Sequence, residues 1–241
     1  MIREKRVVCG IATQPSREAL ASRVVRMLVR QVDLLVVHLD GFPSVPHWAR
    51  NPKIRVRHHV SRSRAGAAGK LDCLEEAVPG DVILLVDDDI VVNRRLTKRM
   101  VEALFAQPKP SVVGAHGSLV RPPLNSFVHD RQVIQLQEEL AYDQQVDVLA
   151  TCLCAFEFDT FVPRPSTWRH RNMVDLQFAL DACAQNVSLV SIARKRGEFR
   201  FADSFQPGSI FEALINDDSI QTGLAHQLVD CQETSGQFSS R

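Results

Sequence analysis

Five consecutive apolar residues, 82–86, run directly into three consecutive aspartates, Asp87, Asp88 and Asp89. An uninterrupted apolar run of this length is typical of a strand that is covered on both faces, whereas a strand with one solvated face alternates apolar and polar residues. The segment 81–89 therefore predicts a central strand of a helix-covered sheet, with carboxylates at its carboxyl end. In doubly wound sheets that end is where ligands bind.

The segments on either side alternate between strand and helix patterns. Apolar runs predict strands at residues 7–13, 32–39, 54–57, 111–114, 146–156 and 187–193. Apolar residues at helical spacing predict helices at about 16–30, 66–77, 96–105, 132–142, 172–185 and 211–215. The expected fold class is α/β, a mostly parallel central sheet flanked by helices. No compositional break marks a linker, so residues 1–234 are expected to form one domain, followed by a flexible tail at 235–241.

Charge and cysteine usage narrow the function classes. The chain has 29 Lys and Arg against 28 Asp and Glu, a net charge of +1, and lacks the basic excess expected of a nucleic-acid-binding protein. The six cysteines lack the paired spacing of structural zinc sites, and we expect them to be reduced and mostly buried. No apolar stretch has the length of a signal peptide core or of a membrane span, so we expect a cytoplasmic protein, or one peripheral at the inner face of a membrane.

The three aspartates are the strongest chemical signal. In an extended chain Asp87 and Asp89 project to the same face, so they would form a pair of converging carboxylates. At an effective dielectric of about 20, two unit charges about 6 Å apart repel by roughly 3 kcal/mol, so such a pair needs a cation. Mn²⁺ or Mg²⁺, held by one or two carboxylates and by the phosphates of a substrate, would meet that need. The alternative is an acidic turn that caps the following helix through Asp89 or Asn93.

The motif Leu-Val-Asp-Asp-Asp at residues 85–89 resembles the DxD motif of family 2 glycosyltransferases of the GT-A fold. The resemblance is to bacterial members, of the kind that assemble surface polysaccharides or glycolipids. Further segments resemble such members in the same order, at residues 10–13, 51–56, 66–70, 113–117, 172–175 and 192–196. Residues 146–155 depart from the pattern, because relatives tend to carry a glycine-rich and threonine-rich strand there. The resemblance implies a nucleotide-sugar-binding half at 1–110 and an acceptor and catalytic half at 111–234.

The resemblance assigns the donor side to residues near the strand ends. It implies that Asp89 ligates the metal, and that Asp87 also ligates it or reaches toward the ribose. It also implies that the DxD motif, Asp88 included, contacts the sugar nucleotide. Further nucleotide-binding candidates are Thr13, Arg17, Asp40 and Lys70. Lys70 follows two glycines at a predicted helix start, where an ammonium group and backbone amides can meet a diphosphate; the alternative is a surface lysine. Asp40 resembles a nucleobase contact, although Asp40-Gly41 is also a good turn and Arg17 can equally face solvent.

The acceptor side is expected to supply a general base. Inverting transfer requires a carboxylate that takes the proton of the attacking hydroxyl, and Asp175, in the first turn of a predicted helix, is the candidate. The alternative is that Asp175 only stabilises the positive end of its helix dipole. His116 and His129 are candidates for acceptor or metal contacts and His226 for a third metal ligand, but a lone histidine is more often structural. The basic groups at 55–59 and 62–64, and at 194–196 with Arg200, are candidates for closing over the diphosphate or for meeting an anionic acceptor. The alternative is that they are solvated faces.

These observations predict a metal-dependent, inverting glycosyltransferase. The expected partners are a nucleotide-sugar donor, with UDP-sugars first, and a saccharide or lipid-linked saccharide acceptor. A haloacid-dehalogenase-type phosphatase is an alternative, with Asp87 as nucleophile, Asp89 as acid and Asp217-Asp218 as the later acidic pair. The second alternative is a non-catalytic module that binds nucleotide sugars, because fold alone does not establish turnover.

Overall fold

The fold is built on an eight-stranded mixed sheet. A computed structural model describes residues 5–61, 65–170, 172–202 and 217–235 of the 241. The strand order is β3-β2-β1-β4-β10-β5-β11-β8. Their bounds are β1 Val7–Thr13, β2 Leu34–Asp40, β3 Ile54–His59, β4 Val82–Val86, β5 Ser111–Gly114, β8 Gln144–Gln145, β10 Leu153–Glu157 and β11 Ser188–Ser191.

The sheet is mostly parallel. β3, β2, β1 and β4 run parallel, as do β5 and β11, while β10 is antiparallel to both β4 and β5, and β8 is antiparallel to β11. The central strands β1 and β4 are buried along almost their whole length, which agrees with their uninterrupted apolar sequences. The predicted α/β fold class is confirmed.

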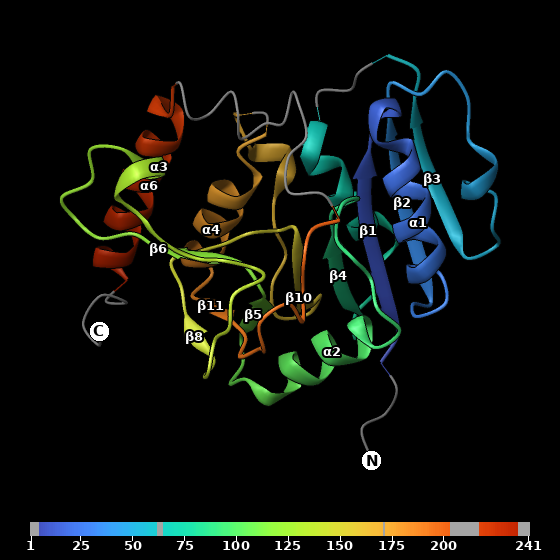
Figure 1. The fold of residues 1–241 in the computed structure, drawn as a ribbon. Helices are drawn as coiled ribbons and strands as arrows, with labels where there is room; N and C mark the ends of the chain where they lie inside the picture. Colours follow the sequence, from blue (N-terminus) through green and yellow to red (C-terminus); the bar gives the residue numbers. More distant parts are fainter. Residues whose placement is uncertain (1–4, 62–64, 171, 203–216, 236–241) are drawn as a thin grey trace.

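Helices cover both faces of the sheet (Figure 1). On one face α1 (Glu18–Leu28) and α2 (Leu96–Ala106) contribute Leu28 and Met100 to a core that contains Leu84 of β4. On the other face the 3₁₀ helix η3 (Gly66–Glu76), α4 (Val174–Ala184) and α6 (Ser219–Thr234) pack over Leu85 of the same strand. Alternate residues of β4 thus enter opposite cores, as period-two geometry requires.

Smaller elements lie on the α4 side. A three-stranded sheet has the order β7-β6-β9, with β6 at Gly117–Leu119, β7 at Gln132–Ile134 and β9 at Val148–Leu149. The short helix α3 spans Phe127–Asp130, and 3₁₀ turns occupy Pro15–Arg17 (η1), His47–Ala49 (η2) and Pro165–Thr167 (η4). None of the helices among the described residues combines the length and the apolar character needed to cross a bilayer.

Two of the expected elements in the second half are wrong. The segment 132–142 is not a helix, because its first three residues pair with β6 and this tertiary pairing overrides the helical tendency of the Gln and Glu residues. The run 146–156 is not one strand, since a turn at Thr151 and Cys152 separates β9 from β10. The expected helix at 211–215 lies outside the described residues, as does the tail from residue 236.

The last helix and a disulfide were not expected. α6 carries Leu224, Ala225, Leu228 and Val229 on its buried face and packs against α4. Cys183 of α4 and Cys231 of α6 form a disulfide with a Cα–Cα distance of 6.5 Å, so the expectation that all cysteines are reduced is wrong for this pair. The two cysteines are 48 residues apart, and only the docking of α6 on α4 brings them together. The other four cysteines, Cys9, Cys73, Cys152 and Cys154, are free and buried, as expected.

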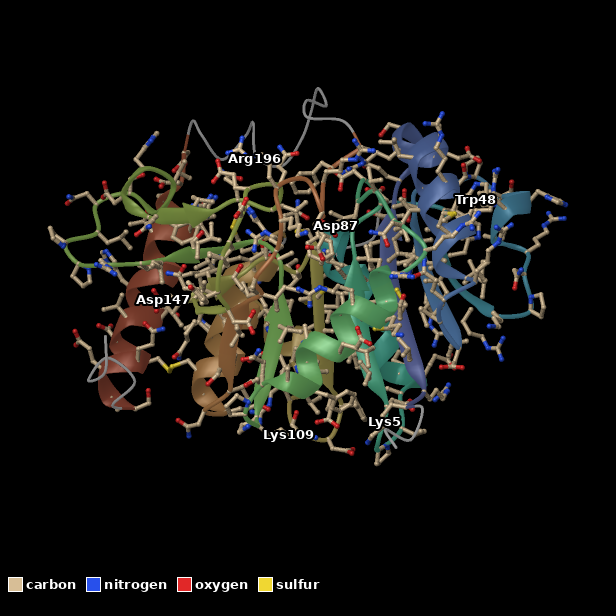
Figure 2. The ribbon with its side chains drawn as sticks, turned by 60° about the horizontal axis from the view of Figure 1, so that its bottom comes forward. Lys5, Trp48, Asp87, Lys109, Asp147 and Arg196 are labelled. Carbon is tan, nitrogen blue, oxygen red and sulfur yellow. A yellow bond between two sulfur atoms is a disulfide. The ribbon has the colours of Figure 1, made fainter. Side chains whose placement is uncertain are left out.

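The topology gathers several chain segments at one edge of the sheet. The carboxyl ends of the parallel strands β2, β1 and β4 lie at this edge, in that spatial order. Because β10 runs antiparallel to β4, its amino end, just after Thr151 and Cys152, lies at the same edge. Asp87 is at this edge, and Lys5 and Lys109 are at the opposite one (Figure 2). The predicted ligand edge therefore receives residues from both halves of the chain.

Candidate functional site

The chain turns within the three aspartates. Asp87 still follows the line of the sheet, because its backbone N–H donates to Cys152 O at 2.8 Å, but Asp88 and Asp89 lie in a turn closed by Ile90 N donating to Asp87 O. Asp87 pairs with Lys70 of η3, whereas Asp89 pairs with Arg17 beside α1. The expected same-face arrangement of Asp87 and Asp89 is thus wrong in detail, since it assumed an extended chain.

Lys70 is a buried partner of the acidic turn. Only 2% of the residue is exposed, and its Nζ forms an ion pair with Asp87 and donates to Thr151 O at 3.3 Å and Thr151 Oγ1 at 3.2 Å. Burial lowers the pKa of Lys70, but the charges of Asp87 and Asp175 and the hydrogen bond to Asp87 outweigh it and raise the pKa above its ordinary value. Lys70 is therefore charged and holds Asp87, and the surface-lysine alternative is excluded.

Two glycines allow η3 to carry Lys70 onto the sheet. A Cβ at Gly10 of β1 would lie 1.9 Å from Lys70 O and 2.8 Å from Cys73 Sγ. A Cβ at Gly69 would lie 2.4 Å from the ring of His38 in β2. Both distances are below any real carbon contact, so the close approach of η3 to the two strands requires glycine at both positions. The local sequence thereby places Lys70 beneath the end of β4.

Asp88 points back to the end of β1. Thr13 Oγ1 donates to Asp88 Oδ2 at 2.7 Å, and Arg17 Nη2 lies 3.0 Å from Asp88 Oδ1 and 2.5 Å from Asp89 Oδ2. Burial, supplemented by the charges of Asp87 and Asp89, raises the pKa of Asp88 to about 7 against the opposing effects of Arg17 and Thr13. Thr13 and Arg17 therefore order the acidic turn from the α1 side.

One carboxylate oxygen of the acidic turn is available to bind a cation. Asp89 Oδ1 is buried and has no hydrogen-bond partner among the described residues. Burial and then the charge of Asp87 raise the pKa of Asp89, so the two carboxylates still interact. No group of three or more His, Cys, Asp or Glu side chains in the described part of the chain is arranged to hold a metal ion. In this turn Asp89 Oδ1 is the carboxylate oxygen that could take a divalent ion, with Asp87 close enough to act on its charge. Magnesium sites completed by phosphates typically use one or two carboxylates.

Thr151 connects the acidic turn to Asp175. Its backbone N–H and its Oγ1 donate to Asp175 Oδ1 at 2.8 and 2.7 Å, while its Oγ1 and carbonyl oxygen accept from Lys70. Asp175 lies in the first turn of α4, as predicted. Because both hydrogen bonds go to Oδ1, Asp175 Oδ2 has no hydrogen-bond partner among the described residues. A chain of contacts therefore runs from Asp87 through Lys70 and Thr151 to Asp175.

Sequence reasoning did not select Thr151. It is a polar residue inside the largely apolar run 146–156 and is only 1% exposed, and this buried polar character is the signal that marks it. Asp40 lies at the carboxyl end of β2, 7% exposed, opposite His59 in the β2–β3 register. It is on the predicted edge, one strand further from Asp87 than Thr13 is.

The other candidates have different surroundings. His226 Nε2 contacts Leu124 O on the α6 side, so His226 is not a metal ligand at the acidic turn, and His129 lies in α3, an element that packs on α6. Arg194 is buried and bonded to carbonyl oxygens, and Arg57 pairs with Glu75 and Glu76. Residues 62–64 of the first basic group lie outside the described residues.

His116 is a half-buried, neutral histidine near Asp175. Leu136 N donates to His116 Nδ1 at 3.1 Å, which places the ring proton on Nε2. Burial, with the charges of Arg131 and Arg194, lowers the pKa of His116 to about 4 against the opposing charge of Asp175.

Replacement of His116 by asparagine, which keeps an acceptor for Leu136 N–H, is expected to flatten the acid limb of the stability profile. With a folded pKa of about 4 and an ordinary unfolded value of about 6.5, the unfolded state binds more protons between these pH values. The free energy of unfolding of the wild type therefore falls as the pH drops through this window, by an amount on the order of 2 kcal/mol. Urea titrations at pH 7.5, 6.5, 5.5 and 4.5 measure the difference between the two proteins. Parallel profiles would contradict a His116 that is neutral in the folded protein.

The sequence matches no protein-family model and no curated protein. Solved structures do resemble the chain. A crystal structure of glucosyl-3-phosphoglycerate synthase from Mycobacterium tuberculosis, in complex with Mn²⁺, UDP and glucosyl-3-phosphoglycerate, has a TM-score of 0.52 at 12% identity, covering 96% of this chain and 80% of that one. A structure of 4-diphosphocytidyl-2C-methyl-D-erythritol synthase has a TM-score of 0.48 at 15% identity, covering 92% and 99%. A structure of TarS from S. aureus has a TM-score of 0.47 at 13% identity, covering 77% and 57%.

The likeness to the mycobacterial synthase identifies the fold, which is GT-A-like. At 12% identity it establishes the architecture and leaves the chemistry to the residues of this chain.

Proposed function

We propose that this chain is a metal-dependent, inverting glycosyltransferase of the family 2 type. In this proposal it moves a sugar from a nucleoside-diphosphate sugar, with UDP-sugars as the first candidates, to a hydroxyl of a saccharide or lipid-linked saccharide. The observation that carries the proposal is the contact chain Asp87–Lys70–Thr151–Asp175. It joins a carboxylate turn at the ligand edge of a GT-A-like sheet to a second carboxylate with one free oxygen.

The donor side is supported by the composition of the acidic turn. Asp89 Oδ1, buried and unpartnered, and Asp87 would hold Mn²⁺ or Mg²⁺. The bound ion would neutralise charge on the leaving diphosphate. The structurally similar mycobacterial synthase was crystallised with Mn²⁺ and UDP. Lys70, being buried, would act on the nucleotide by fixing Asp87 and not by touching the phosphates, while Thr13 and Arg17 fix Asp88. Asp40 remains the predicted nucleobase contact.

The acceptor side is supported by the orientation of Asp175. Thr151 fixes Oδ1 with two hydrogen bonds, which leaves Oδ2 to accept the proton of the acceptor hydroxyl. The hydroxyl oxygen then forms its bond to the anomeric carbon as the bond to the diphosphate oxygen breaks. Inversion follows because base and leaving group lie on opposite sides of that carbon. Residues 1–110 would bind the donor and residues 111–234 would supply the acceptor side.

The contacts of Asp217 and Asp218 argue against the phosphatase alternative, which requires this acidic pair near Asp87. Asp217 bonds to Ser219 N at the start of α6, and Asp218 accepts hydrogen bonds from Ser126 Oγ and Val128 N of α3. Both carboxylates thus serve local structure at α3 and α6, and neither pairs with Asp87. A binding module would have the same site but no catalytic turnover. Only a measurement of turnover therefore distinguishes it from the proposed enzyme.

A donor screen tests the function. The protein is heated with UDP-, GDP-, CMP- and dTDP-sugars, with MnCl₂ or with EDTA, and nucleoside diphosphate release is measured in parallel. We expect one donor to raise the melting temperature only with metal, because a ligand of the folded state stabilises it by mass action. Asp89→Asn is expected to abolish this shift and Asp159→Asn, a change at an exposed turn after β10, to preserve it.

Other results would refute the proposal. No stabilising donor under either condition would exclude nucleotide-sugar binding. Hydrolysis of p-nitrophenyl phosphate that Asp87→Asn abolishes would favour the phosphatase. Donor binding without any nucleoside diphosphate release, in wild type and Asp175→Asn alike, would favour the binding module.

A further inference from the structure

Arg131 is a half-buried arginine whose guanidinium has no hydrogen-bond or ion-pair partner in the described part of the chain. It follows α3 and precedes β7, and its guanidinium carbon lies 4.3 Å from the centroid of the Phe127 ring. Its Nε is buried and donates no hydrogen bond, and no other hydrogen bond or ion pair involves the side chain among the described residues. A buried N–H without an acceptor is energetically unfavourable, so an acceptor supplied by a ligand would be stabilised at this group.

Arg131 and Asp175, the candidate base, are linked through the small sheet β7-β6-β9. β7, which begins directly after Arg131, pairs with β6, and β6 pairs with β9. β9 leads into Thr151, which holds Asp175. Burial lowers the pKa of Arg131. The negative charges of Asp175 and Asp218 oppose this effect, and that of Asp175 is the larger. The guanidinium thus lies within electrostatic reach of Asp175 without bonding to it.

The other cations near Asp175, or near its neighbour His116, are already bonded. Lys70 is bound by Asp87 and Thr151. Arg194 donates to Leu136 O, Ile192 O, Gln135 O and Ser191 Oγ. Asp218, the second acid near Arg131, is bonded to α3 through Ser126 and Val128. Of these cations, Arg131 alone keeps its N–H groups for a ligand in the described part of the chain.

We propose that Arg131 binds an anionic group, a phosphate or a carboxylate, carried by the acceptor. The inference rests on the proposed function and names the acceptor class of the same site. An acceptor with its hydroxyl at Asp175 and its anion at Arg131 would be held at two points of opposite charge. The planar guanidinium fork suits either anion, since both accept two parallel hydrogen bonds. An anion there would supply the acceptor that the buried Nε lacks.

The test is calorimetric titration of the full chain with three matched probes: glycerol 3-phosphate, glycerate and glycerol. These differ only in carrying a phosphate, a carboxylate or no charge. The variants are Arg131→Met, whose stem still covers Phe127, and Arg121→Met, a change at an exposed arginine in the preceding loop. We expect at least one anionic probe to bind the wild type more tightly than glycerol. Arg131→Met should weaken that binding about tenfold or more, and Arg121→Met should leave it unchanged.

The pattern of binding identifies the anion and separates this inference from the proposed function. Preference for glycerol 3-phosphate would name a phosphate, and preference for glycerate a carboxylate. Anionic probes that bind no better than glycerol, or that bind Arg131→Met as well as Arg121→Met, would overturn the inference; phosphate captured elsewhere, for instance near Arg17, gives the latter result. These titrations need no donor, so a failed donor screen with an Arg131-dependent anion site would refute the proposed function alone.

Discussion

Asp175→Asn is expected to lower the rate of sugar transfer by about 100-fold to 10,000-fold, the range that a positioned general base contributes. The amide has the shape of the carboxylate, and its oxygen still accepts from Thr151 N and Oγ1, so the local structure is preserved. What is lost is the basic Oδ2. The measurement is release of nucleoside diphosphate at saturating donor, with donor affinity followed separately by thermal shift.

Donor affinity is the internal control for Asp175→Asn. Metal-dependent donor binding should change by less than about threefold, because the acidic turn and Lys70 are untouched. Asp230→Asn, a change at an exposed position of α6, should retain full turnover. An Asp175→Asn enzyme that keeps wild-type turnover would remove Asp175 from the chemistry, and joint loss of donor binding and turnover would point to a structural role instead.

Gly10→Ala is expected to lower the free energy of unfolding by about 3 kcal/mol or more. The new Cβ would lie 1.9 Å from the carbonyl oxygen of Lys70, a backbone atom that cannot move unless η3 moves. Displacing η3 also displaces Lys70 from Asp87, so metal-dependent donor binding should be lost in whatever protein remains folded. Urea unfolding followed by fluorescence measures the first effect, and the donor thermal shift measures the second.

Gly223→Ala provides the matched control for Gly10→Ala. Gly223 lies in α6, is exposed, and a Cβ there meets nothing within 4 Å. The same chemical change is therefore expected to stabilise the protein, by roughly 0.5–1 kcal/mol, because alanine favours the helix. Equal effects at the two glycines would show that packing of η3 against β1 does not limit stability.

The first half of the fold, residues 1–110, followed from local patterns. Residues 82–86 and 7–13 are uninterrupted apolar runs, and a strand buried on both faces has few other solutions, so both strands and the acidic edge were predicted. The second half of the chain was harder to predict. The 132–142 segment has helix-forming residues yet pairs as β7, because its partner β6 is set by tertiary contacts that no local pattern reveals.

The sequence patterns predicted where the candidate residues lie in the fold more closely than which groups they contact. Asp87, Asp89 and Asp175 were selected from strand and helix positions, but the turn after Asp87 removes the expected alternation, since Asp88 and Asp89 both contact Arg17. The burial of Lys70 depends on the missing side chain of Gly10, a relation between residues 60 positions apart that spacing rules do not contain. Thr151 was missed for the same reason, because its importance lies in two partners from distant segments.

The bridge between Cys183 and Cys231 changes what a break in the backbone would do. A protease that cuts once between α4 and α6 would release nothing, because the C-terminal fragment stays bonded through sulfur to the helix that carries Asp175. Under oxidising conditions such a nicked protein migrates as one species, and only a reductant separates its two pieces. Whether the two fragments stay together after a cut therefore depends on the redox state of this disulfide as well as on the peptide chain.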